Sequence, residues 1–169
     1  DVYVLGTVYR NERNGFRDVT PSVVRDNGGG YGVLSADFDG DGGMDLAFSS
    51  RNHYLLRNLQ GDNGRSRSLQ VLVLDGKGHY TRAGSEVRIY EAGTRTLLGT
   101  RVVETGSGYG SHSAVPVHFG LGEEGPVDVE ITTLTREGRR LARLTNVDPG
   151  SQAGAVITVK VGADGQIVR

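Results

Sequence analysis

The 169-residue chain contains no cysteine and no tryptophan, and its formal net charge is only -1. Without cysteine it cannot form disulfides, thiolate metal sites or a cysteine nucleophile. The near-neutral charge gives no global field to attract nucleic acid or an anionic membrane surface. No apolar run approaches the roughly 20 residues that span a bilayer, and no signal-like segment opens the chain. We therefore expect no nucleic-acid partner and no membrane insertion, and any export signal to have been removed or to lie upstream.

Glycine, in contrast, is abundant, with 27 residues. It supplies the positive φ of tight turns, and glycine-bearing turns separate most of the segments in which apolar residues alternate with polar ones. Pro116 falls in such a segment and should lie at a sheet edge or bulge, because proline has no N–H to donate. The alternating segments after residue 67 are 69–74, 86–90, 98–103, 114–119, 127–131, 140–144 and 155–161. This spacing predicts an all-β chain whose second part is an antiparallel β-sandwich.

The first part carries an internal repeat of about 45 residues, a period typical of propeller blades. Residues 1–11 and 45–58 each read as an aspartate, a short strand, a turn and a strand ending in Arg-Asn. An isolated blade leaves apolar faces and strand edges uncovered. We therefore expect a β-propeller-type blade fragment, either as part of a longer protein or as a chain completed by a partner. That partner is a second polypeptide with the missing blades or a second copy of the chain.

A polar, glycine-rich segment at residues 60–67 marks the predicted domain boundary. It predicts a blade fragment at residues 1–62 and a sandwich domain at 63–169. An ordinary hairpin loop inside one domain is the alternative.

The strongest chemical signal is the acidic loop at residues 37–45. Its alternating carboxylates would repel one another in a tight loop without a cation, and calcium accepts 6 to 8 oxygen ligands. Gly40 and Gly42 allow the bends that curl the chain. The predicted calcium ligands are the side chains of Asp37, Asp39, Asp41 and Asp45 and the carbonyl oxygen of Gly43. Magnesium, which prefers rigid octahedral sites, and a solvated turn without metal are the alternatives.

The EF-hand pattern does not extend through this loop, because position 12 is Phe48 and no amphipathic helices flank it. The flanking segments, 31–36 and 46–49, predict a calcium-bound β-hairpin instead.

Asp37, Asp39, Asp41, Gly42 and Asp45, with residues 9–11 and 15–20, resemble the FG-GAP or VCBS repeat. Residues 106–111, 117–122 and 127–131 resemble the ASPIC/UnbV domain that follows such repeats. The resemblance implies propeller blades with calcium hairpins and an extracellular protein that acts in matrix or surface interactions without established catalytic chemistry. The sequence departs from the pattern at residues 132–134, where Thr-Thr-Leu replaces a frequent Trp-Pro pair.

No catalytic residues or organic cofactor are predicted. The four histidines lack metal-ligand spacing, and the serines around His112 lack a nucleophile-elbow signal. His118 is expected in a core, donating a hydrogen bond to a backbone carbonyl. Residues 106–110 lack the Gly-Lys-Ser/Thr of a phosphate loop. The basic stretch at 136–143 indicates a solvated hairpin face, with a weak polyanion site as the alternative.

These observations predict a secreted calcium-binding adhesion or protein-interaction module, or a periplasmic or cell-surface one if the source is bacterial. The metal is structural, and the partner is another protein or a matrix or glycan ligand. One alternative is a carbohydrate-binding accessory domain that uses Tyr80, Tyr90 and Tyr109. A third hypothesis is an enzyme in which the calcium loop is only a scaffold.

Overall fold

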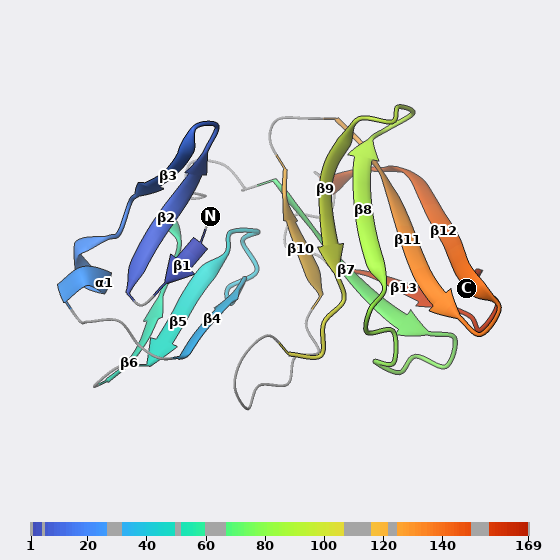
Figure 1. The fold of residues 1–169 in the computed structure, drawn as a ribbon, viewed down its shortest axis with the longest axis horizontal. Helices are drawn as coiled ribbons and strands as arrows, with labels where there is room; N and C mark the ends of the chain where they lie inside the picture. The colour runs from blue at the N-terminus through green and yellow to red at the C-terminus, as the bar shows by residue number, and fades with distance from the viewer. Residues whose placement is uncertain are drawn as a thin grey trace. The chain divides into compact units, whose positions relative to one another are not determined.

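The fold of the chain is almost entirely β-structure (Figure 1), which confirms the predicted class. The computed structural model describes residues 2–4, 6–26, 32–49, 52–59, 67–106, 116–121, 125–149 and 156–168. The chain divides into two compact units. The first comprises Asp1–Phe38 and Met44–Leu59, and the second comprises Asp39–Gly43 and Gln60–Arg169. Residues 60–66 lie outside the described ranges, so the boundary at residue 62 stays a prediction.

The first unit contains two small antiparallel sheets. One sheet joins β1 (Val2–Val4), β2 (Thr7–Glu12) and β3 (Gly15–Asp18), and the other joins β4 (Gly32–Ala36), β5 (Asp45–Ser49) and β6 (His53–Leu56). Phe48 of β5 is 3% exposed, stacks on Tyr54 with ring centroids 4.9 Å apart, and lies 6.4 Å from the Tyr3 ring. Aromatic packing therefore connects the two sheets of this unit.

The internal repeat corresponds to two equivalent hairpins. β1 pairs with β2 through Tyr3 and Val8, and β5 pairs with β6 through Phe48 and Tyr54. The second hairpin begins at Asp45, the first residue of β5. Asp1 lies outside the described residues, so an earlier acidic loop closed by it stays a prediction.

A short helix, α1 (Ser22–Asp26), was not predicted from the sequence. It follows Pro21, whose carbonyl oxygen accepts hydrogen bonds from Val24 and Arg25. One turn is too short to display helical periodicity, and only the proline before it is a start signal. Within the described ranges, no helix combines the length and apolar character needed to cross a membrane.

The second unit contains two four-stranded sheets. One has the order β10 (Val117–Gly120), β7 (Ser68–Asp75), β13 (Val156–Val161) and β14 (Ile167–Val168). The other has the order β12 (Gly138–Val147), β11 (Val127–Thr135), β8 (Glu86–Glu91) and β9 (Leu97–Val102). All seven strands predicted after residue 67 exist, and Pro116 directly precedes the edge strand β10.

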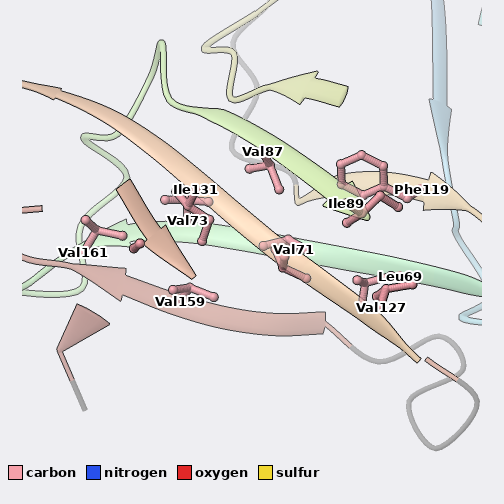
Figure 2. Close-up of a cluster of buried hydrophobic side chains, with 12 residues drawn as sticks. Leu69, Val71, Val73, Val87, Ile89, Phe119, Val127, Ile131, Val159 and Val161 are labelled. Carbon is pink, nitrogen blue, oxygen red and sulfur yellow. The ribbon is translucent and has the colours of Figure 1, made fainter. Parts of the chain in front are cut away.

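The apolar core of the second unit is formed by residues of both sheets. Leu69, Val71 and Val73 of β7 are at most 3% exposed, as are Val129 and Ile131 of β11. Figure 2 shows the labelled side chains of β7 and β11 gathered with those of the neighbouring strands. Alternate residues of each strand enter the core, as expected for strands with one buried face.

One strand pair departs from the predicted antiparallel arrangement. β13 runs parallel to β7, from Val156 opposite Gln70 to Val161 opposite Asp75. A parallel pair needs a long crossover connection, and strands β8 to β12 lie between β7 and β13 in the chain. Period-2 patterning does not indicate strand direction, so the expected antiparallel arrangement was wrong at this pair.

Candidate metal centre

The acidic loop is closed by a regular hairpin. β4 and β5 pair antiparallel, and Ala36 lies opposite Asp45, so the loop begins and ends on adjacent strands. Gly40 and Gly42 have φ values of 74° and 90°. Side chains with a Cβ avoid this region, which confirms the predicted role of both glycines in curling the loop. Tyr31, predicted in the first strand, lies outside the described residues.

Three carboxylates converge at the base of the loop. Oxygen atoms of Asp37, Asp39 and Asp45 all lie within 4.8 Å of one another. Asp45 is only 3% exposed. Close like charges are costly, particularly where one is shielded from water, and a hard divalent cation with oxygen ligands relieves that repulsion. The donor set therefore fits calcium.

Asp45 also organises the backbone around the site. Its Oδ2 accepts the Phe38 N–H at 2.9 Å, and its Oδ1 accepts the Asn58 N–H at 2.7 Å. These hydrogen bonds tie the start of the loop and the end of the β5–β6 hairpin to one buried carboxylate. Each carboxylate oxygen has two lone pairs, so accepting one N–H leaves capacity for a cation.

Asp41 lies outside the cluster of three carboxylates. Its Oδ1 accepts the Gly43 N–H at 2.7 Å, and Asp39 Oδ1 accepts the Asp41 N–H at 3.2 Å. Both are short-range contacts of the kind that aspartate forms in turns. The predictions that Asp41 and the Gly43 carbonyl are ligands remain predictions.

His118 contacts the tip of this loop, whose residues Asp39–Gly43 belong to the second unit. Its Nε2 lies 3.0 Å from the Gly42 carbonyl oxygen. A carbonyl oxygen only accepts, so Nε2 carries a proton and donates. The predicted hydrogen bond to a carbonyl is confirmed. The predicted core position is wrong, because Phe119 enters the core and the neighbouring His118 is half-buried.

Other acidic side chains of the second unit obtain compensation from protein groups. Asp128 accepts the Asn146 N–H at 2.9 Å and the Gly93 N–H at 3.1 Å, and pairs with Arg143 at 2.8 Å. The two backbone hydrogen bonds, followed by Arg143, lower the pKa of the Asp128 carboxyl group. Such donor sets show how a buried carboxylate is stabilised without a metal.

The tyrosines proposed for carbohydrate binding are not equivalent. Tyr80 is 58% exposed, but Tyr90 is 5% exposed and lies beneath the Arg95 guanidinium, 4.9 Å from the ring centroid. The expectation that Tyr90 is an exposed platform was wrong, because Tyr90 packs within the sheet. Tyr109 lies outside the described residues, as do His112 and nearly all of 106–111.

The basic stretch forms ion pairs along the β11–β12 hairpin. Arg140 pairs with Glu137 at 2.7 Å, and Arg139 lies 3.4 Å from Glu86. These partners fit a solvated hairpin face, the first of the two interpretations of this stretch.

Comparisons with known proteins agree with the order of the two units. The family model for the FG-GAP-like repeat matches residues 1–48, and the model described as ASPIC and UnbV matches residues 76–149. Cartilage acidic protein 1 is 34% identical in Mus musculus and 33% identical in Homo sapiens, each over 113 residues or 65% of this chain. The chain spans 17% of the length of these relatives. No solved structure matches.

Proposed function

Because this chain is an FG-GAP-like repeat followed by an ASPIC and UnbV domain, we propose that it is an extracellular, non-enzymatic protein-interaction module stabilised by calcium. The observation that carries the calcium assignment is the convergence of three carboxylates within 4.8 Å on a glycine-curled loop. Asp37, Asp39 and Asp45 would hold the ion, with Asp41 and the Gly43 carbonyl oxygen as further ligands. The ion supplies positive charge that offsets the repulsion of the carboxylates.

Calcium in this position has a structural role. The loop joins two paired strands, and Asp45 is hydrogen-bonded to Phe38 and Asn58. An ion bound to Asp45 therefore stabilises backbone on both sides of the loop. The site offers carboxylates but no residue that we assign as a nucleophile or general base. This composition supports a scaffold role.

An extracellular location suits such a site. Millimolar calcium would saturate a site of micromolar Kd and stabilise the folded state by about 4 kcal/mol through mass action. The low calcium concentration of cytosol would leave the same site largely empty. The similarity to cartilage acidic protein 1 supports this location.

The experiment that tests calcium binding is calorimetric titration of the 169-residue chain with calcium, followed by calorimetric unfolding in calcium and in chelator. We expect saturable binding and a higher unfolding temperature in calcium. Asp26→Asn, which alters an exposed carboxylate at the end of α1, is the control and should keep both effects. An unfolding temperature that is the same in calcium and in chelator contradicts the proposal.

The proposed partner is another protein or a matrix or glycan ligand. The outer face of the sheet formed by β12, β11, β8 and β9 supports an interaction role. Leu134 is 74% exposed and Leu141 is 55% exposed, and the strand register places both on that face. A glycan array and binding assays with purified matrix proteins distinguish the two partner classes.

The blade fragment also supports a proposal of completion by other blades or by a second copy of the chain. Phe16 of β3 is 61% exposed, and Leu55 of β6 is 64% exposed. Exposed apolar side chains on small sheets favour association with further strands. Size-exclusion chromatography with light scattering tests the second copy, and a stable monomer at high concentration contradicts it.

A further inference from the structure

The peptide unit that joins Gly42 and Gly43 is held at both of its polar groups. Its carbonyl oxygen, on Gly42, lies 3.0 Å from His118 Nε2. Its N–H, on Gly43, donates to Asp41 Oδ1 at 2.7 Å. A peptide unit is planar, so fixing the direction of the carbonyl also fixes the direction of the N–H. The contact with His118 is therefore linked, through one planar unit, to the hydrogen bond that Gly43 donates to Asp41.

This peptide joins two of the residues of the loop whose backbone loses most conformational entropy when the loop becomes ordered. Gly42 and Gly43 are consecutive, and Gly42 adopts a φ of 90°. Glycine loses more backbone entropy on ordering than any other residue, so two in succession make the tip costly to fix. A hydrogen bond from outside the loop offsets part of that cost. Both glycines are nevertheless buried, so the tip is packed as well as bonded.

His118 is suited to this task by its position on a sheet. It lies on β10, directly opposite Gln70 of β7. Its neighbour Phe119 is 2% exposed and part of the core, so β10 is anchored by packing. Because side chains alternate along a strand, His118 projects from the opposite face. The donor that reaches the loop tip thus comes from a paired and packed strand.

We propose that His118 is a positioning residue for the calcium loop. This inference rests on the proposed function, since it concerns the same site. His118 is not a ligand through Nε2, because that nitrogen donates to the Gly42 carbonyl. It acts by holding the Gly42–Gly43 peptide in the orientation that the loop needs before the ion arrives. Removing the donor leaves a looser loop, and the ion must then order it at the expense of affinity.

The test compares His118→Phe, which removes the donor, with His118→Gln, whose side-chain amide can donate to the same carbonyl. Thr158→Val is the matched control, because Thr158 is exposed on β13 of the same sheet. Calcium titration by calorimetry should show His118→Phe weaker than wild type by about three- to tenfold, the effect of one hydrogen bond. His118→Gln should recover most of the affinity, and Thr158→Val should bind as the wild type does.

Amide hydrogen exchange of Gly43 provides a readout that needs no metal. In chelator, exchange at Gly43 should be faster in His118→Phe than in the wild type or in His118→Gln. Circular dichroism of each variant establishes that the sheets remain folded. Wild-type affinity in His118→Phe overturns the inference while leaving calcium binding intact. A wild-type chain that binds no calcium contradicts the proposed function and this role of His118 together, so the two failures are distinguishable.

Discussion

Asp45 is predicted to serve both the metal-free fold and the ion, whereas Asp39 serves chiefly the ion. Asp45 is 3% exposed and accepts the Phe38 and Asn58 N–H groups at 2.9 and 2.7 Å. Asp45→Asn keeps one oxygen and turns an amide NH2 group toward a buried backbone donor. Hydrogen bonds to charged groups contribute about 1.5–3 kcal/mol each, and a buried unsatisfied group costs a similar amount. Relief of the repulsion within the cluster offsets part of this loss, so we expect Asp45→Asn to lower the metal-free stability by about 2–4 kcal/mol.

Asp39→Asn should behave differently, because Asp39 is exposed and the asparagine oxygen can still accept the hydrogen bond from the Asp41 N–H. Its metal-free stability should equal that of wild type or exceed it by about 0.5 kcal/mol, because the substitution is on the surface and removes one of the repelling charges. Both variants should lose most of the stabilisation that calcium adds, because each removes a carboxylate of the cluster.

The assay is chemical unfolding followed by circular dichroism, in chelator and in millimolar calcium, with Asp26→Asn as the control. The difference in unfolding free energy between the two variants in chelator measures the structural role of Asp45. The difference between chelator and calcium for each variant measures the stabilisation that the ion adds. Unchanged metal-free stability in Asp45→Asn would refute the structural role. Retention of the wild-type calcium increment in Asp39→Asn would refute the assignment of Asp39 as a ligand.

Three further predictions concern ion choice, packing and pH. Millimolar magnesium should raise the unfolding temperature far less than calcium, because magnesium demands octahedral geometry and sheds water reluctantly. Gly99→Ala should cost about 1–3 kcal/mol in chemical unfolding, because its Cβ would lie 3.0 Å from the Phe119 ring. Gly120→Ala, with open space around its Cβ, is the control. Folding lowers the pKa of Asp128 from 3.8, so its stabilisation is present above that pH and is lost as the pH falls through the folded pKa. Asp128→Asn should flatten the acid limb of a stability-versus-pH curve.

The parts of the fold that local chemistry determines could be predicted from the sequence. The hairpin around the acidic loop follows from flanking strands and from glycines that tolerate positive φ, as at Gly40 and Gly42. Strand positions in the second unit follow from period-2 alternation. Both features are encoded in stretches of about ten residues, so neither depends on how distant segments of the chain pack together.

The features that were missed depend on contacts between distant segments or on elements too short to show a period. The parallel pairing of β13 with β7 joins residues more than 80 positions apart, as Val156 and Gln70 illustrate. The contact of His118 with Gly42 spans 76 positions. Its isolated position in an alternating strand indicated a core residue, since sequence does not reveal what lies on the other face of a sheet. β14 has two residues, and α1 has five.

The hydrogen bonds of the loop predict that calcium binds to a largely formed site. Asp39 and Asp41 accept N–H groups two residues ahead, and Asp45 ties down Phe38. These bonds curl the loop before any ion is present, so binding has little backbone left to order. Far-ultraviolet circular dichroism should therefore change little on calcium addition, while the unfolding temperature rises. A large gain of β-signal on addition of calcium would mean that the ion folds the hairpin instead, and that the loop bonds alone do not hold it.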